Sequence, residues 1–218
     1  MNVGAFFSPD ELAEIERAVK AAERRTSGEI VPYVVGRSDD YPQAAWKGAC
    51  AGALVAALAA AAVRAWGGFW GPAPAWWLAL PPLAGAALGL LAVALVPPLR
   101  RALVAGADLE EAVGRRAGLA FLEQEVFKTA ERTGILIFLS LFERRVVVLG
   151  DAGINRAVAQ EKWQAIVDEI VAGIRAGTPG AALSRAIGRC GELLERHRVE
   201  RRPDDRDELP DHLRIKPE

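Results

Sequence analysis

Three acidic residues lie at positions where a folded chain could use them for chemistry. Glu29 opens a segment rich in β-branched residues, Glu143 lies in a short turn between two further apolar segments, and Asp151 follows the last of these. Ligands of α/β proteins bind in loops at the ends of the sheet, and hard cations prefer several carboxylate or carbonyl oxygens. The pattern therefore predicts a metal site formed by the three acids, with Ca²⁺ as the candidate ion.

Each of these acids also has an ordinary structural role open to it. Asp151 could cap the helix that follows it, Glu143 could be a polar turn residue, and Glu29 could be a solvent-facing strand residue. Phosphatase chemistry would further need a nucleophile or a metal-activated water, and no residue supplies either convincingly. We therefore predict no catalytic residue, and an enzyme is the less favoured class.

The other reactive side chains exclude several kinds of site. His197 and His212 are the only histidines, both near a charged tail, and no P-loop, G-x-S-x-G or Cys-x-x-Cys motif occurs. The net charge of −1, without a basic patch interleaved with aromatic residues, gives no reason to expect a nucleic-acid partner. Cys50 and Cys190 are predicted to be free thiols that serve as small apolar residues.

The least polar part of the chain is residues 44–98. From residue 48 to residue 96 the only charge is Arg64, and a spanning helix needs about 20 apolar residues. We predict a transmembrane hairpin with spans at about 45–63 and 76–96, joined by a turn rich in Gly, Pro and Trp. Tryptophans gather at the span ends, where a bilayer interface favours them. A buried hairpin in a soluble core is the less favoured alternative, because neither segment has a polar face.

Basic residues beside the spans predict the orientation of the hairpin. Arg37 and Lys47 precede the first span and four arginines follow the second, whereas the turn carries only Arg64. The positive-inside rule then places both flanking parts in the cytoplasm of a multi-pass protein of the inner (cell) membrane.

Small residues recur inside the two predicted spans. Glycines four residues apart let helix backbones approach closely. The candidate packing residues in the membrane are Gly48, Gly52, Gly85 and Gly89. They could pack the hairpin on itself, and self-association of the protein stays open.

The remaining sequence predicts helices and strands on both sides of the hairpin. A capped helix starts at Ser8, and Pro32 suits an edge position or a bulge. The predicted strands are 29–36, 134–141 and 145–150, and the predicted later helices are 99–132 with a break around 114–118, 154–176 and 178–198. Neither half has enough strands for a core. We therefore predict one α/β domain built from residues 1–43 and 99–198, followed by a charged, flexible tail at 199–218.

Motifs in these segments resemble the TPM domain family, which includes photosystem II repair proteins of the thylakoid lumen and many bacterial membrane-anchored proteins. The motifs are Thr26-Ser27-Gly28-Glu29 before the first strand, Thr133-Gly134 before the second, and the Arg144 turn leading to the valine strand and Gly150. The chain particularly resembles the bacterial subgroup with an inserted membrane hairpin. Two sites depart from the family pattern: Glu143 stands alone where an acidic pair is common, and Gly150-Asp151-Ala152-Gly153 replaces a Gly-aromatic-Gly run.

The resemblance implies an α/β/α sandwich. It also implies divalent-cation binding, weak acid-phosphatase activity in the plant members, and roles in assembling or maintaining membrane complexes. We therefore expect a membrane-anchored scaffold, or assembly or maintenance factor, whose partner is a membrane protein complex. The alternatives are a divalent-cation-dependent phosphatase and a cation-sensing regulatory module.

Overall fold

The structure is a computed structural model, and it folds into two compact units. The first combines Met1–Asp39 with Glu110–Glu218, and the second is Asp40–Leu109. The residues described are 6–67, 71–72, 74–129, 131–156, 158–196 and 209–216. The two units are taken separately below.

The first unit is built on a four-stranded mixed sheet with strand order β3-β2-β1-β4. The strands are β1 (Ile30–Val35), β2 (Ile135–Ser140), β3 (Arg145–Gly150) and β4 (Arg214–Lys216). β1 runs parallel to β2, with Ile30 opposite Ile135, whereas β2 and β3 form an antiparallel hairpin. The strand that precedes the second unit is thus hydrogen-bonded directly to the strand that follows it.

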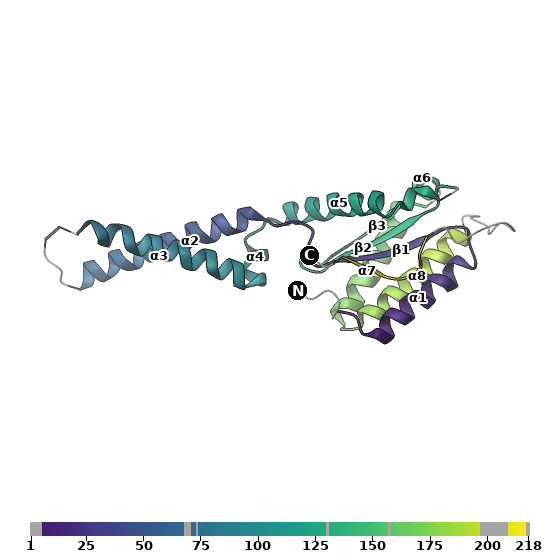
Figure 1. Ribbon diagram of the computed structural model, residues 1–218, viewed down its shortest axis with the longest axis horizontal. Coiled ribbons are helices and arrows are strands. Elements are labelled where there is room, and N and C mark those ends of the chain that lie inside the picture. Colours follow the sequence, from purple (N-terminus) through teal and green to yellow (C-terminus); the bar gives the residue numbers. More distant parts are fainter. Residues whose placement is uncertain are drawn as a thin grey trace. The chain divides into compact units, whose positions relative to one another are not determined.

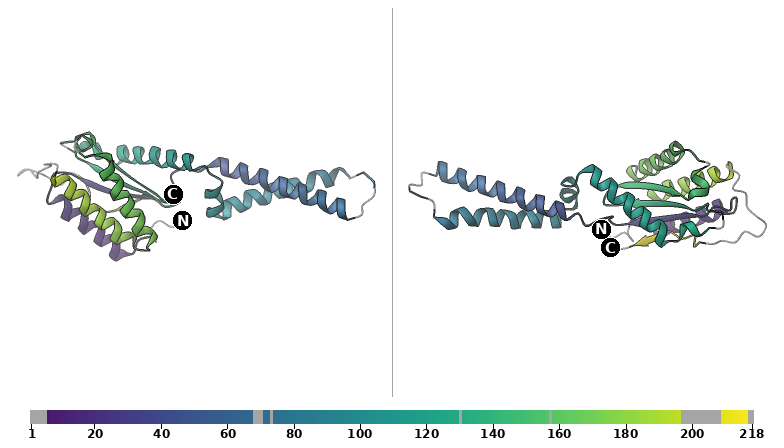
Figure 2. Two further views of the ribbon diagram at one scale, coloured as in Figure 1. Left: turned by 180° about the vertical axis from the view of Figure 1, so that it is seen from behind. Right: turned by 90° about the horizontal axis from the view of Figure 1, so that it is seen from above.

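Helices cover both faces of this sheet (Figures 1 and 2). On one face lie α1 (Pro9–Glu23), α7 (Gln160–Arg175) and α8 (Pro179–Arg196), which enclose strand residues such as Val34 and Ile137. On the other face α5 (Gly106–Glu123) packs Val113, Ala117 and Ala120 against Tyr33 and Phe138. The predicted α/β/α sandwich is therefore confirmed.

Local signals at the start of the chain fold as their residue types predict. Ser8 accepts a hydrogen bond from the Glu11 amide (3.2 Å), and the Glu11 carboxylate accepts one from the Ser8 amide (2.9 Å), which together form the capping box of α1. The carbonyl of Glu29, just before β1, accepts a hydrogen bond from the Ile135 amide, and that of Val35, at the end of β1, accepts one from the Leu141 amide. By alternation the backbone of Pro32 faces the other side of the strand, where β4 does not reach, so its missing N–H leaves no gap in the ladder.

Two helix boundaries differ from the sequence prediction. The break expected at 114–118 is wrong: α5 runs through both glycines, and the chain instead leaves the helix between α4 (Pro97–Ala102) and α5. A glycine in a helix costs about 1 kcal/mol, which burial of the opposite face of α5 offsets. The helix predicted at 154–176 is split into α6 (Ala152–Asn155) and α7. Asp151 caps α6 early, and the Asn155 amide donates to the Gly150 carbonyl (2.5 Å).

The charged tail is the third difference. The favoured prediction for residues 199–218 is a flexible tail, with docking of the DELPDHL segment on the domain or on a partner as the alternative; in the structure Arg214–Lys216, just after that segment, form β4 and pair with Tyr33, Val34 and Val35. Residues 199–208 lie outside the described part of the chain. The prediction failed for β4 because a three-residue strand with two cations carries no apolar periodicity.

The second unit is a helical hairpin of α2 (Pro42–Trp66) and α3 (Ala75–Leu95), followed by α4 (Figure 1). Both long helices are long and apolar enough to cross a membrane, and only 11% of the most apolar window of each is buried. Their outward surfaces carry large apolar side chains, including Leu54, Leu58, Leu83 and Trp66, which is 88% exposed. A hairpin buried in a soluble core is therefore not what the chain forms. Residues 68–70 and 73 of the connecting turn lie outside the described part.

Candidate functional site

The three predicted metal ligands do not meet in the structure. Glu29 precedes β1 and Asp151 follows β3, so both lie at the end of the sheet where β1 and β2 begin. Glu143 lies in the turn where β2 passes into β3, at the opposite end, roughly 17 Å away along six-residue strands. The hairpin reversal puts this turn far from the other two acids. Within the described ranges, no group of three or more His, Cys, Asp or Glu side chains is placed to hold a metal ion.

Glu143 is fully buried and its carboxylate is engaged at both oxygens. One oxygen accepts a hydrogen bond from the Ser38 amide (2.9 Å), and the other accepts one from the Ser140 hydroxyl. The two serine hydroxyls are themselves 2.8 Å apart. Glu143 therefore ties the segment after β1 to the end of β2 and the following turn. Both carboxylate oxygens serve this connection.

Asp151 takes the capping role that was its structural alternative. Its Oδ1 accepts from the Ala152 amide (2.6 Å) at the start of α6. Arg132 pairs with the same carboxylate, with Nε 2.8 Å from Oδ2 and Nη2 3.1 Å from Oδ1. The side chain is 5% exposed. A buried carboxylate neutralised by its own arginine is a structural ion pair.

Glu29 lies in a cluster of charges that the sequence did not reveal. Glu23, at the end of α1, accepts a hydrogen bond from the Ile30 amide (2.9 Å) next to it. Burial, with the nearby negative charges of Glu29 and Asp211, raises the pKa of Glu23 to about 9. Partial burial lowers the pKa of the Arg214 guanidinium in β4, and the nearby negative charge of Glu29 opposes this shift. Glu29 and Asp211 therefore lie near a Glu23 side chain that is protonated at neutral pH.

This protonation predicts a pH-dependent stability. A carboxyl whose pKa is higher in the folded than in the unfolded chain stabilises the fold fully below about pH 4.5, and this stability is lost as pH rises towards 9. Glu23→Gln imitates the protonated form and should raise the free energy of unfolding at pH 8 by up to about 5 kcal/mol. The measurement is urea unfolding at pH 5 and pH 8. Glu14→Gln, on the exposed side of α1, should leave the pH dependence as it is, and a Glu23→Gln variant with wild-type dependence would refute the assignment.

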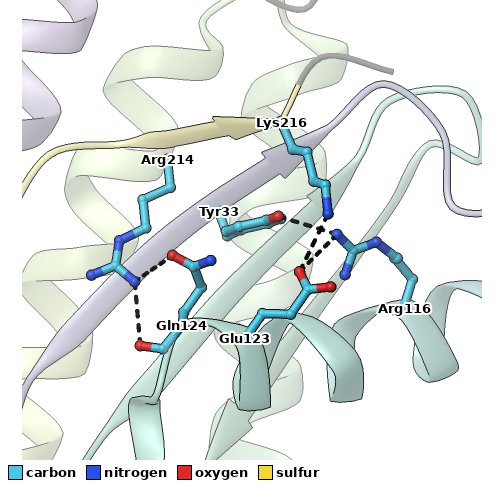
Figure 3. A network of polar contacts seen from close by, with 6 residues as sticks. All are labelled: Tyr33, Arg116, Glu123, Gln124, Arg214 and Lys216. Carbon is cyan, nitrogen blue, oxygen red and sulfur yellow. Dashed lines mark hydrogen bonds and ion pairs between the residues drawn. The ribbon is translucent and has the colours of Figure 1, made fainter.

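A polar network fastens β4 to α5, and sequence reasoning missed it (Figure 3). Its members come from three elements: Tyr33 from β1, Arg116 and Glu123 from α5, with Gln124 directly after this helix, and Arg214 and Lys216 from β4. Nη2 of Arg116 lies 3.2 Å from both the Tyr33 hydroxyl and Glu123 Oε2.

The two cations of β4 complete this network. Lys216 Nζ lies 3.4 Å from the same oxygen of Glu123, and Arg214 donates to Gln124 Oε1 (2.7 Å). The one signal in the sequence is the spacing of Arg214 and Lys216, which puts both side chains on one face of a strand. The network therefore fixes the short, polar strand β4 to the end of α5.

The four predicted packing glycines come together at the crossing of α2 and α3. A Cβ on Gly52 would fall on the carbonyl oxygen of Gly85, and a Cβ on Gly89 would fall on that of Gly48. The two backbones are thus in direct contact at two levels, one helical turn apart on each helix. Only glycine allows this approach, because any side chain would occupy the space of the facing backbone.

The first unit is an α/β/α sandwich whose paired strands β1 and β2 are separated in the sequence by a helical hairpin. Residues 91–193 match the family model described as TPM domain. This stretch of the chain therefore matches a TPM domain, in agreement with its motifs. β1 lies outside the matched residues and joins the domain through its pairing with β2.

A solved structure shares this fold. It is the NMR structure of the BA42 protein from the psychrophilic bacterium Bizionia argentinensis, with a TM-score of 0.58 and 18% sequence identity over 97% of this chain and 96% of that chain. At this identity the likeness shows the fold alone. A comparison with curated proteins gives no match.

Proposed function

We propose that this protein is a membrane-anchored scaffold whose TPM domain, on the cytoplasmic side of the inner membrane, helps to assemble or maintain a membrane protein complex. The observation that carries the proposal is the second unit. It is a hairpin of two helices that bury their glycines against each other and turn Leu, Val and Trp outward. Lipid is the environment in which such a surface is stable.

The chemistry of the domain supports a binding role over an enzymatic one. The carboxylates of Glu143 and Asp151 already contact the Ser38–Ser140 connection, the α6 cap and Arg132. Cys190 is buried in α8, and its burial raises the pKa of the thiol to about 12, far from a reactive thiolate. A phosphatase would need a nucleophile or a metal-activated water, and we assign neither to this site. These features favour a domain that acts by binding a partner through its surface.

The scaffold proposal is tested by affinity purification of the full chain from its own membranes in mild detergent. A defined set of membrane proteins should co-purify in constant proportion. The matched control is the variant in which residues 41–105 are replaced by a flexible linker, which should lose this set. If the full chain purifies alone, or if it hydrolyses a phosphate monoester at a rate that Glu29→Ala/Asp151→Ala abolishes, the scaffold proposal is wrong.

The proposed topology gives a second expected result. In a background in which Cys50 is replaced by alanine, a cysteine at Gly67 should react with a membrane-impermeant thiol reagent added to intact cells. A cysteine at Glu161, on the exposed side of α7, should react only after the cells are opened. The converse labelling pattern would place the TPM domain outside the cytoplasm, and labelling at both positions would contradict a spanning hairpin.

Separation of the three acids predicts the response to calcium. A ligand that binds only the folded state at 100 times its dissociation constant adds about 2.7 kcal/mol, and this would raise the melting temperature by roughly 5–10 °C in a domain of this size. We expect no such rise at millimolar Ca²⁺. A rise that Asp151→Asn abolishes would restore Asp151 as a ligand, since asparagine still caps a helix.

A further inference from the structure

The two edges of the sheet differ in how far another strand covers them. β1 is covered along half of its outer edge by β4, whereas in the described part of the chain β3 pairs only with β2. The Asp151 amide donates to the Gly134 carbonyl, so the β3 residues that face β2 are Arg145, Val147 and Leu149. The backbone groups of Val146, Val148 and Gly150 therefore point away from the sheet.

Two of these outward residues keep their hydrogen-bonding groups open. The Gly150 carbonyl accepts from Asn155 (2.5 Å), which closes the edge at that end. Val146 and Val148 have no such partner among the described residues, so two N–H and two C=O groups line the outer edge. They repeat at about 6.8 Å, the spacing at which another strand pairs. An edge of this kind is a template for strand addition.

A groove lies along this edge. It has a volume of about 350 Å³ and is lined by Glu110 and Val113 of α5, by Val146–Val148 of β3, and by Trp163 and Val167 of α7. Trp163 is 2% exposed, and its indole N–H has no acceptor in the described part of the chain. The groove thus combines apolar walls, an open strand edge and an unused donor.

The charged residues that line the groove indicate which charge a bound segment should have. Arg145 pairs with Glu110 (3.5 Å), and Asp168 accepts from Gln164 (2.9 Å). Arg144, which also lines the groove, is exposed and forms no ion pair with any described residue. Its backbone is fixed in the left-handed region (φ 54°) at the end of the turn. A carboxylate on the occupant would give Arg144 an ion-pair partner.

The opposite edge shows how this sheet holds an added strand. There a three-residue strand pairs with β1, and side-chain contacts from Arg214 and Lys216 to Gln124 and Glu123 fix it (Figure 3). The same combination, a short backbone ladder with one or two charged contacts, is available at β3 with the charges exchanged: there the arginine belongs to the domain.

We propose that the β3 edge is the docking site of the domain, and that its occupant is an extended segment of a partner protein with alternating apolar side chains and one acidic residue that pairs with Arg144. Binding is by strand addition, in which the ladder provides affinity and the pockets between α5 and α7 provide specificity. This rests on the proposed scaffold function and names the surface that it uses.

The test uses the full chain in mild detergent and a displayed library of random decapeptides as the probe. Selected peptides should share alternating apolar residues and an acid. Their binding should slow amide exchange at Val146 and Val148 at least tenfold, while the amides of β2 that are already paired change little. Selected peptides that leave these two amides unprotected would overturn the proposal, and protection by a second copy of the chain alone would replace it with self-association.

Two pairs of variants distinguish the contribution of the backbone hydrogen bonds from that of the Arg144 charge. Arg144→Glu should weaken peptide binding at least fivefold, and Arg156→Glu, an exposed arginine beyond the other end of β3, should not. Val148→Pro removes an outward N–H and should abolish binding, whereas Val148→Ala shortens the same side chain and keeps the N–H. If Val148→Pro fails to fold, as exchange in β2 would reveal, the arginine pair still decides. Equal binding by Arg144→Glu and the wild type contradicts the proposal.

The outcome is distinguishable from failure of the scaffold function. If Arg144→Glu binds no peptide but still co-purifies the membrane proteins of the wild type, the scaffold stands and docking lies elsewhere. If the wild type purifies alone and its β3 amides are still protected by peptides, the docking site stands and the partner is not a membrane complex.

Discussion

A variant in which residues 41–105 are replaced by a flexible linker should be soluble and should unfold in one cooperative transition. The two ends of the replaced segment are held close, since Asp39 pairs with Arg115 at 2.5 Å. Arg115 lies about 13 Å along α5 from Gly106, a distance that a linker of about 12 Gly and Ser residues spans easily. Size-exclusion chromatography and urea unfolding measure the result.

The matched comparison is the fragment 106–218, which should not fold. It lacks Ile15 and Val19 of α1 and the buried apolar residues of β1, all at most 3% exposed. Each such side chain contributes about 1.5–3 kcal/mol, so their sum of roughly 10–20 kcal/mol is as large as the 5–15 kcal/mol by which a domain is usually stable. A fragment as stable as the linker variant would mean that β1 is not part of the domain.

Gly85→Leu should destabilise the hairpin strongly. The new side chain would meet the carbonyl oxygen of Gly52 and the Cβ of Ala56, neither of which can move without separating the helices. Overpacking of this kind costs about 1–3 kcal/mol or more, which corresponds to a fall in melting temperature of roughly 5–10 °C. Tryptophan fluorescence in mild detergent reports it, because five of the six tryptophans lie in residues 46–77.

The control introduces the same leucine side chain on the outside of the same helix. Ala87 faces away from α2 and is exposed, so Ala87→Leu should leave the melting temperature within about 2 °C of the wild type. Gly85→Ala should fall between the two variants. If Gly85→Leu and Ala87→Leu melt alike, the crossing at Gly52 and Gly85 does not hold the hairpin together.

Much of this fold follows from local sequence patterns. The capping box at Ser8, the apolar strand ending at Ser140 and the valine strand from Arg145 are all where periodicity and end signals place them. The glycines of α2 and α3 were recognisable because close helix approach depends on one residue type at a fixed spacing. These features depend on interactions within a few residues, or on composition.

The features that could not be predicted depend on contacts between distant segments. β4 is a strand because Glu123 and Gln124 are available to it, and the helical glycines 114 and 118 are tolerated because the other face of α5 is buried. For the acids, residue type and position at strand ends were correctly noted. Their separation followed from the parallel pairing of β1 with β2, which brings Glu29 to the end of the sheet opposite the Glu143 turn.

The pairing of Ile30 with Ile135 has a consequence for biosynthesis. At about 5–20 residues per second, a ribosome completes β2 roughly 5–20 s after β1, and both apolar helices emerge in the interval. During that time β1 and α1 have no sheet to join, so the amino-terminal segment cannot complete its packing. In the proposed topology, closure of the domain therefore requires both ends of the hairpin to lie on the same side of the membrane, and insertion of only one of the two helices would prevent β1 from pairing with β2.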